Sequence, residues 1–469
     1  MSDLPSNWLN VALGDLATIT SGIGFPISYQ GETTGDIAFF KVGDISRDVA
    51  KHGGLLGADN AQHFVSGKVA VELKGKTISS GSTVFAKIGE AIKLNRRAFV
   101  TDECLVDNNV VAVKAIFDAS DQYFYRFIQT QDLTDLSRAT TVPSLRKGDI
   151  ESLVVPLAPL HEQKRIADKL DTLLSRVDAC RERLDRVPAT LKRFRQSILA
   201  AACSGQLTAD WREVNDRVSV SASLFNRATP RTGSSDLPES WLACTVGDVM
   251  NLKNGYAFKS TDYVAAGIPL VRISNIQDGR VTLDNCVSLP EAKANWDFVV
   301  DPGDILVAMS GATTGKFGVY SGSERCLQNQ RVGNLRILYD GEVCTGYRNI
   351  YLQSLRKQIE DAAYGGAQPN ISPAKIGALP FNCPPVPEQH EIVRRVEQLF
   401  AFAEALEARV ATAQAQVNRL TPSLLRKAFR GELVPQDPND EPATELLKRI
   451  QTTRAAEPKR GKSSKRRTK

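Results

Sequence analysis

Two short segments contain residues typical of enzyme active sites. Residues 309–318 (MSGATTGKFG) are similar to a phosphate-binding loop, in which backbone N–H groups and a lysine hold phosphates and a following Ser or Thr binds magnesium. The glycine spacing is one residue short, however, and Phe317 stands where the Ser or Thr is required. Residues 381–386 (FNCPPV) approach the Asn-Pro-Pro-aromatic loop of amino-methyltransferases, but Cys383 interrupts it and no aromatic residue follows. Neither segment predicts a catalytic site.

Carboxylates, histidines and cysteines are not grouped at the spacings of metal or nuclease sites. Carboxylate and lysine pairs such as Glu72 with Lys74 are expected by chance in a sequence that is 24% charged. The four histidines lack metal-ligand spacing, the eight cysteines form no C-x-x-C pair, and no glycine-rich turn for S-adenosylmethionine is present. We therefore expect no metal and no cofactor in this chain, and free thiols in a reducing compartment.

The composition is that of a globular protein with two or three domains. The chain has 469 residues, of which 42% are hydrophobic. It contains no apolar run of about 18 residues, and its first residues, MSDLPSNW, do not have the pattern of a secretion signal. We expect a cytoplasmic protein with no membrane span.

A tandem repeat organises the chain. Residues 3–25 (DLPSNWLNVALGDLATITSGIGF) return as residues 236–258 (DLPESWLACTVGDVMNLKNGYAF), with nine identities in 23 positions. Residues 104–110 (CLVDNNV) return as residues 326–332 (CLQNQRV). From Pro143 onward the two copies stay 226 positions apart. Each half is therefore expected to be a mixed α/β domain of about 150 residues followed by one long helix.

Each copy ends in a stretch with a seven-residue hydrophobic repeat that is typical of coiled-coil helices. The predicted seam consists of Ile166, Leu170, Leu173, Val177, Leu184, Leu191 and Ile198 in the first helix and Ile392, Val396, Leu399, Leu406, Val410, Val417 and Leu424 in the second. Cys180 and Leu420 occupy further positions of the repeat, and Pro188 and Pro422 lie inside it, where each is expected to kink its helix. A stripe this narrow favours two helices packed on each other. Two helices that each lie on their own domain are the alternative.

A proline-rich segment followed by Glu-Gln precedes each helix, at Glu162-Gln163 and at Glu388-Gln389. The prolines end the preceding strand, and a carboxylate in the first helical turn is favoured by the helix dipole. Because this helix start occurs twice, we expect two equivalent domains, each joined to one of two equivalent helices. Antiparallel packing of these helices is expected to hold the domains at opposite ends, which is an architecture for measuring a distance.

This order of domain, P-x-x-EQ-x-x-I helix, second domain and second such helix resembles the specificity subunit of Type I restriction-modification enzymes over residues 3–433. Residues 187–212 and 422–438 are especially similar to the helix ends of that family. The resemblance implies that each domain is a target recognition domain for one half of a bipartite site in double-stranded DNA, and that the helices set the distance between the halves. It also implies that two modification subunits, together with restriction subunits, dock around the helices and carry the S-adenosylmethionine, Mg²⁺ and ATP.

Bases are recognised by polar side chains, with Arg or Lys suited to guanine and Asn or Gln to adenine. We expect such residues in the polar, turn-rich segments between the repeated pieces. The candidates in the first domain are Lys87, Lys93, Asn95, Arg96, Arg97, Thr140 and Thr141. The candidates in the second domain are Tyr256, Lys259, Thr313, Thr314, Lys316, Gln328, Asn329, Gln330, Arg331, Gln368 and Asn370. For any single residue, a plain role at the solvated surface is the alternative.

The net charge of +6 comes from the C-terminal end. Residues 454–469 carry eight basic residues and one acidic residue, whereas the first domain has a net charge of −3 and the second of −2. A polycationic, disordered tail adds salt-sensitive and sequence-independent affinity for phosphates. The slightly acidic domains predict that the chain alone binds DNA weakly and that partner subunits supply much of the electrostatic attraction.

The expected fold class is α+β, with two tandem mixed α/β target recognition domains, each followed by a long helix, and an antiparallel coiled coil formed by the two helices. The expected boundaries are 1–157 for the first domain, 158–206 for the first helix, 207–235 for a linker, 236–385 for the second domain, 386–433 for the second helix and 434–469 for a polar tail with a basic, disordered end. The expected function is that of a non-catalytic DNA sequence-recognition subunit, which directs partner subunits of a Type I restriction-modification complex. A free-standing DNA methyltransferase or nuclease with a cryptic site, and a coiled-coil scaffold protein, are the alternatives.

Overall fold

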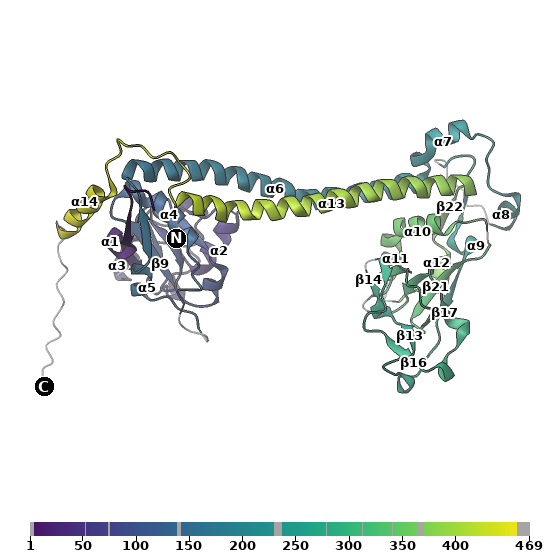
Figure 1. The fold of residues 1–469 in the computed structure, drawn as a ribbon. Helices are drawn as coiled ribbons and strands as arrows, with labels where there is room; N and C mark the ends of the chain where they lie inside the picture. The colour runs from purple at the N-terminus through teal and green to yellow at the C-terminus, as the bar shows by residue number, and fades with distance from the viewer. Residues whose placement is uncertain are drawn as a thin grey trace. The chain divides into compact units, whose positions relative to one another are not determined.

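The computed structural model divides the chain into two compact units (Figure 1). The residues that it describes are 4–51, 53–73, 76–137, 142–228, 237–277, 279–311, 313–339, 341–363 and 370–456. The first unit joins Met1–Leu184 to Thr412–Lys469, and the second unit is Asp185–Ala411. Each unit therefore contains one α/β domain, part of the first long helix and part of the second.

The domain of the first unit is built on three sheets. The largest has the order β2 (Ala17–Ser21), β9 (Val110–Ala115), β6 (Thr83–Ala86), β7 (Arg97–Val100) and β4 (Leu55–Leu56). A second sheet has the order β5 (Phe64–Val65), β3 (Ile37–Phe40) and β8 (Cys104–Val106), and β1 (Leu9–Ala12) pairs with β10 (Val154–Leu157). The helices of this domain are α1 (Leu13–Leu16), α2 (Val42–Lys51), α3 (Gly67–Glu72), α4 (Asp121–Thr130) and α5 (Lys147–Glu151). The central strands β6 and β9 consist mainly of apolar residues and are almost wholly buried, as is expected for strands covered on both faces.

The domain of the second unit has the same plan. Its largest sheet has the order β12 (Met250–Asn254), β21 (Val332–Ile337), β18 (Ile305–Ala308), β19 (Phe317–Tyr320), β15 (Gly279–Val281) and β14 (Ile276–Gln277). The next sheet has the order β16 (Val287–Leu289), β13 (Ile268–Val271), β20 (Cys326–Gln328) and β17 (Val299–Val300), and β11 (Leu242–Thr245) pairs with β22 (Pro380–Cys383). The helices are α9 (Val246–Val249), α10 (Thr345–Ser354), α11 (Arg356–Ala363) and α12 (Pro373–Gly377).

The sequence repeat is thus also a structural repeat. The strand order β2-β9-β6-β7-β4 corresponds to β12-β21-β18-β19-β15, and in both sheets the last of these pairs is parallel. The order β5-β3-β8 corresponds to β16-β13-β20, again with a parallel pair at the same place. Two copies of one framework therefore present two different sets of loops.

Two long helices follow the domains. The first, α6 (Leu160–Ser204), has 45 residues, and the second, α13 (Val386–Ala428), has 43. Helix α6 continues through Pro188, and α13 continues through Pro422, without a break. In the first unit Arg181 of α6 donates to Asn418 of α13, and in the second unit Arg195 pairs with Glu407. Because the residue numbers rise along one helix and fall along the other, the predicted antiparallel pairing is confirmed.

The side chains of all the predicted seam residues are buried or half-buried. The most buried lie where a domain also covers the helix pair, such as Ile166 and Leu170 in the first unit and Ile392 and Val396 in the second. Toward the middle of α6 the seam is less covered, and Leu184 is half-buried. Cys180 and Leu420, which the heptad pattern also places in the seam, are exposed.

Two segments are more ordered than the sequence led us to expect. The expected linker contains α7 (Ala209–Val214) and α8 (Ala222–Arg227), and Leu224 is fully buried in the core of the second unit. The expected polar tail contains α14 (Ala443–Ala456). Its apolar residues Ala443, Leu446 and Ile450 recur at helical spacing and are buried in the core of the first unit. Residues 457–469, which carry most of the basic end, lie outside the described residues.

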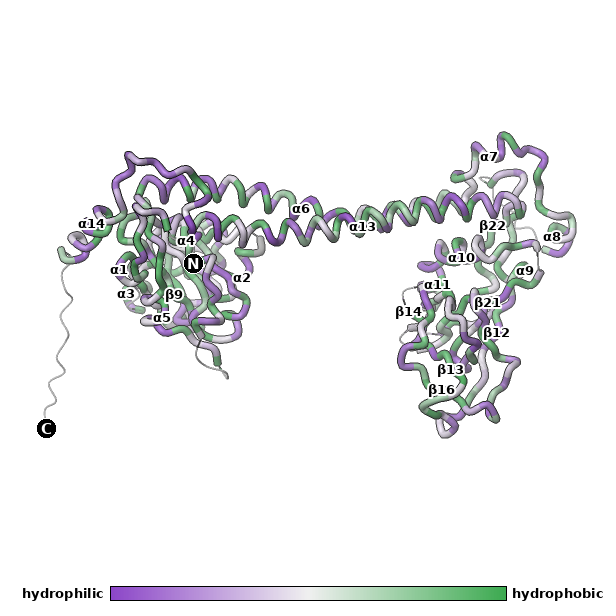
Figure 2. The backbone as a smooth tube through the Cα atoms, viewed as in Figure 1, coloured by the Kyte–Doolittle hydropathy of each residue, from purple (hydrophilic) through white to green (hydrophobic). Residues whose placement is uncertain are grey.

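Hydrophobic residues are frequent in the two domains and recur at intervals along each long helix (Figure 2). Within the part of the chain that the structure describes, no helix combines the length and the apolar character needed to cross a membrane.

Candidate nucleic-acid interface

In the second domain, several strands begin or end at one edge of the framework. Gly333 near the start of β21 pairs with Asn254 at the end of β12, and Val332 pairs with Ala308 at the end of β18. In the neighbouring sheet, the end of β20 lies beside the end of β13. The loops that follow these strands therefore open at the same edge, together with Asn370, which is bridged to Ser310. We call this edge the second polar edge: residues 255–259, 309–311, 313–316, 329–331 and 370.

Most of the predicted residues of the second domain lie on the second polar edge. Tyr256 forms an isolated bridge with Asn329, and Asn370 forms one with Ser310 of the loop after β18. Thr313 donates from its Oγ1 atom to the backbone oxygen of Ile273, at 3.5 Å. Lys259, Lys316, Gln330 and Arg331 have exposed side chains on these same loops.

Two of the predicted residues, Thr314 and Gln328, are buried and stabilise the domain itself. Thr314 is 1% exposed and donates to the backbone oxygen of Gly311 at 2.6 Å. Gln328 is 1% exposed and donates from Nε2 to the backbone oxygen of Lys253 at 2.9 Å. Both side chains are buried and already bond the backbone, which disfavours the predicted base contacts. Gln368 lies outside the described residues.

Aromatic side chains flank the second polar edge. The ring of Tyr256 lies 4.9 Å from that of Phe258 and 5.4 Å from that of Phe298, yet its side chain remains 45% exposed. The Nζ atom of Lys253 lies 4.8 Å from the centroid of the Phe298 ring. An exposed ring beside a cation offers a face for stacking and a charge for phosphate.

The first domain has an equivalent edge, the first polar edge, formed by residues 21–25, 87–96, 107–109 and 144. Ser21 at the end of β2 pairs with Val111, and Ala86 at the end of β6 pairs with Val110. The predicted residue Lys87 follows β6, and its Nζ atom lies 3.2 Å from the Oγ atom of Ser21. An isolated bridge between residues 88 and 144 closes the edge on its other side.

The predicted cluster 93–97 divides between surface and framework. Lys93 is exposed and pairs with Glu90 at 2.7 Å. Arg96 is half-buried and donates to the backbone oxygen of Ser46 at 3.1 Å. Asn95 has a left-handed backbone with φ of 55°, and its Oδ1 atom accepts from the backbone N–H of Leu133 at 3.0 Å. Asn95 therefore ends a helical turn and anchors a neighbouring loop.

Arg97, another of the predicted residues, is also buried. Its side chain is 7% exposed and donates to the backbone oxygens of Asn95 and Gln131. Burial lowers the pKa of its guanidinium to about 10. Strand β7 places this side chain in the interior, which disfavours the predicted contact with DNA. Thr140 and Thr141 lie outside the described residues.

Sequence reasoning missed several residues of the first polar edge. Asn108 is exposed, Asn109 is half-buried, and both follow β8 at the position that Gln330 and Arg331 occupy after β20. The repeat of CLVDNNV as CLQNQRV was the signal that could have identified them. Ser21 was also missed, and only its place at the end of β2 identifies it.

The enzyme-like segments belong to the framework. The loop 309–316 joins β18 to the antiparallel strand β19, whereas a phosphate-binding loop leads from a strand into a helix. Cys383 is fully buried in β22, which pairs with β11. Across the described ranges, no three His, Cys, Asp or Glu side chains are grouped as metal ligands would be.

Each domain is attached to the long helices by a buried carboxylate. Glu162, in the first turn of α6, is 0% exposed and accepts from Trp8 Nε1 at 2.9 Å and from Gln436 Nε2 at 2.5 Å. Burial raises the pKa of the Glu162 carboxyl above its usual value. One carboxylate thus ties the start of the first domain to α6 and to the segment that follows α13.

The second unit repeats this arrangement with a counter-charge. Glu388, in the first turn of α13, is also 0% exposed and accepts from Trp241 Nε1 at 2.8 Å and Thr208 Oγ1 at 2.7 Å. The guanidinium of Arg212 donates to the same carboxylate. The sequence predicted only a favourable dipole at these two glutamates, whereas both are buried hubs that join a domain to one long helix and to the segment that follows the other.

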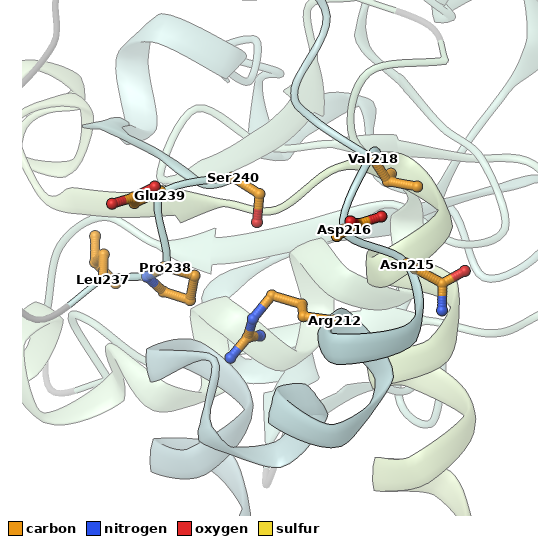
Figure 3. Close-up of a pocket in the computed structure, with 8 residues that line it drawn as sticks. All are labelled: Arg212, Asn215, Asp216, Val218, Leu237, Pro238, Glu239 and Ser240. Carbon is orange, nitrogen blue, oxygen red and sulfur yellow. The ribbon is translucent and has the colours of Figure 1, made fainter.

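A pocket of about 490 Å³ lies beside the hub of the second unit (Figure 3). It is lined by Arg212, Asn215, Asp216, Val218, Leu237, Pro238, Glu239 and Ser240. None of these is a predicted base-contacting residue, and the one arginine among them is engaged with Glu388. The loops of the two polar edges are therefore the candidate site, and the pocket is not part of it.

Comparisons with known proteins agree on one family. The family model of the Type I restriction modification DNA specificity domain matches residues 5–189 and 238–413. The chain is 32% identical over 361 residues to the Type I restriction enzyme EcoKI specificity subunit of Escherichia coli strain K12, covering 73% of each chain. It is 29% identical over 474 residues to the EcoBI specificity subunit of Escherichia coli, covering 96% of this chain and 93% of that relative.

Solved structures show the same fold. The HsdS subunit from Thermoanaerobacter tengcongensis superimposes with a TM-score of 0.60 at 21% identity, covering 92% of this chain and 98% of the other. A chain from a structure of complex assembly and conformational transition in a type I R-M system gives a TM-score of 0.66 at 21% identity, covering 92% and 100%. These likenesses confirm the predicted α+β fold. Because the family model matches most of the chain, in both copies of its repeat, the chain belongs to the Type I restriction modification DNA specificity family.

Proposed function

We propose that this chain is the DNA sequence-recognition subunit of a Type I restriction-modification complex and that it recognises a bipartite site in double-stranded DNA. One observation carries the proposal: the same framework is built twice and presents two polar edges with different residues. Polar side chains on loops held by a rigid framework are suited to bases, which are distinguished by hydrogen bonds at their edges. Two different edges suit two different half-sites.

The chemistry is proposed to reside in partner subunits. Two modification subunits and the restriction subunits would bind around the long helices and supply S-adenosylmethionine, Mg²⁺ and ATP. The failed phosphate-loop and methyltransferase motifs of this chain support that division, since both segments form ordinary parts of the domain framework. A complex that acts on the DNA of the cell works in the cytoplasm.

Charge supports the need for partners. The two domains carry net charges of −3 and −2, so their attraction for phosphates is limited to local groups such as Lys87 and Lys316. Affinity for a DNA backbone rises with the number of phosphates that a protein neutralises. The basic residues of 454–469 add to this attraction without selecting a sequence.

Exchange of one domain tests the proposal. Residues 3–155 are replaced by the corresponding domain of another family member, and the chain is assembled with its modification subunits. Genome sequencing that detects methylated bases is expected to show a new first half-site with the second half-site and the spacer unchanged. A motif in which both halves change, or neither does, would contradict the assignment of one domain to each half-site.

The competing functions make different predictions. A free-standing methyltransferase would bind S-adenosylmethionine, which calorimetry on the purified chain detects, whereas we expect no binding. A coiled-coil scaffold would select no sequence from a pool of random duplexes, even when assembled with its partners.

A further inference from the structure

The turn that follows β8 and the turn that follows β20 are built in the same way. In the first, the backbone N–H of Val110 donates to the oxygen of Asp107 at 3.0 Å, and in the second, that of Val332 donates to Asn329 at 2.8 Å. Each turn is also bonded to the parallel neighbouring strand. The N–H of Asp107 donates to Phe40, and the N–H of Asn329 donates to Val271, each at 3.0 Å. We call residues 107–109 the first turn and residues 329–331 the second turn.

A glycine packs closely against the backbone of each turn. A Cβ atom on Gly22 would lie 2.0 Å from the backbone oxygen of Asp107, and one on Gly255 would lie 2.2 Å from that of Asn329. These separations are far below contact distance, so only glycine allows the strand end and the turn to approach so closely. The backbone of each turn is therefore held in place before any ligand binds, which reduces the entropy lost on binding.

The two turns differ at their outward positions. Asn108 of the first turn corresponds to Gln330 of the second, and Asn109 corresponds to Arg331. Asn108, Gln330 and Arg331 are exposed. Within the described residues, their side chains have no hydrogen-bond or ion-pair partner. Asp107, which precedes Asn108, is part of the framework because its side chain accepts the backbone N–H of Asn109 at 2.8 Å. The corresponding residue of the second turn is Asn329.

We infer that the two turns are base-contacting elements, one for each half-site, and that their outward side chains set which base is accepted. This inference rests on the proposed function. Arg331 has the donor geometry that matches the two acceptors of guanine, and the amides of Gln330 and Asn108 match adenine. The first turn has no guanidinium and contains Asp107, whose carboxylate disfavours a further acceptor such as guanine beside it. The second half-site therefore contains a guanine contact that the first turn does not make.

Two arginines at opposite ends of strand β20 provide a matched test. Arg331 follows the strand at the polar edge, and Arg325 precedes it, where it pairs with Asp301 at 3.2 Å. Arg331→Gln and Arg325→Gln remove the same charge from the same domain. Each variant, as the full chain assembled with its modification subunits, is used to select duplexes from a random pool.

Arg331→Gln is expected to reduce the preference for one guanine of the second half-site by roughly 5- to 150-fold, the range for loss of a bidentate contact. The first half-site and the spacer should be unchanged. Arg325→Gln should leave every position unchanged. An equal loss of affinity for all sequences in both variants would show that Arg331 contacts only the backbone and would overturn the inference.

Exchange of the turns gives a second, independent readout. The double variant Asn108→Gln with Asn109→Arg gives the first turn the residues of the second, and Gln330→Asn with Arg331→Asn does the reverse. Each is expected to change one position of one half-site, the first by adding a preference for guanine. Both exchanges retain polar residues, and melting of the purified chain checks that they fold.

The outcomes separate the two proposals. If wild-type chain selects a bipartite sequence and the exchanged turns leave it unaltered, the turns are not base-contacting elements while the proposed function stands. If the wild-type complex selects no sequence at all, the proposed function itself is wrong.

Discussion

At the scale of single residues, the two buried glutamates are expected to contribute more to the stability of the fold than any surface charge does. Glu388→Ala would leave the Arg212 guanidinium, the Trp241 N–H and the Thr208 hydroxyl without their shared acceptor. Removing one partner of a buried ion pair costs about 3–5 kcal/mol. Calorimetric unfolding of the full chain should show a large loss of stability in the second unit.

The matched variant is Glu162→Ala, because among the described residues the Glu162 carboxylate bonds to the neutral donors of Trp8 and Gln436. Loss of a neutral buried partner costs about 1–3 kcal/mol. The first unit should therefore be less affected than the second is by Glu388→Ala. An equal or reversed order, resolved by hydrogen exchange in each unit, would mean that Arg212 does not act as the counter-charge.

Glu162 also predicts a dependence on pH. Its pKa is raised in the folded state because burial disfavours the charged carboxylate. The folded chain therefore binds this proton more tightly than the unfolded chain, so the contribution to stability is present at low pH and is lost as the pH rises through the raised pKa. Glu162→Gln removes this titration. The stability of the variant relative to wild type should increase as the pH rises from below the usual glutamate pKa, about 4.3, through the raised pKa of Glu162, as measured by denaturant unfolding. A difference that stays constant over this range would argue against the raised pKa.

At the scale of the elements, the long helices are joined by a few polar contacts as well as by their seam. In the second unit Arg195 of α6 forms a two-pronged pair with Glu407 of α13, at 2.6 and 3.1 Å. Both side chains are partly exposed, so the pair should contribute only about 0.2–1 kcal/mol. Arg195→Glu places two carboxylates together and should destabilise the second unit. Adding Glu407→Arg should restore most of the loss if the antiparallel register is correct. A double variant no more stable than the single one would place these residues apart.

The elements also show what a sequence can and cannot predict. The heptad seam was predictable because its period directly reports which face of a helix is covered, and the repeat gave the two-domain fold. The hubs around Glu162 and Glu388 were not predictable. The partners of Glu162 are far away in the sequence, and nothing local indicates that Trp8 or Gln436 donates to it. The helix α14 was missed because its buried residues, such as Leu446 and Ile450, are few and lie among charges.

The candidate site was predicted only at the level of loops. Residue type identified polar clusters, but it does not reveal which side chains point inward. Gln328 and Arg97 lie on strands, where successive side chains face opposite sides, and both turn out to satisfy backbone oxygens in the interior. Exposed Arg331 and Asn108 differ from them only by lying in turns.

At the scale of the whole molecule, the helices are proposed to set the spacer between the half-sites. The boundary between the two units falls after Leu184 in α6 and after Ala411 in α13. Insertion of one heptad into each helix, near Leu184 and Val410, adds about 10 Å of helix. This length corresponds to roughly three base pairs at 3.4 Å each.

The heptad variant, assembled with its modification subunits, should methylate a site whose spacer is longer by a few base pairs and whose half-sites are unchanged. Insertion of one heptad into α6 alone is the control, and it should disrupt the seam and reduce activity. Full activity of the matched insertion on the original spacer would rule out the helices as the element that sets the distance.

The division of the chain also determines the order in which it can fold during synthesis. The second unit is one continuous stretch and can close its core as soon as Ala411 has left the ribosome. The first unit is made first but completed last, because its core includes Leu425, Phe429, Leu446 and Ile450. The rings of Tyr123 and Phe127, which pack against Phe429, lack this cover until nearly the whole chain has been translated. During synthesis the N-terminal domain is therefore expected to expose apolar surface for longer than the second unit does, and such surface favours aggregation.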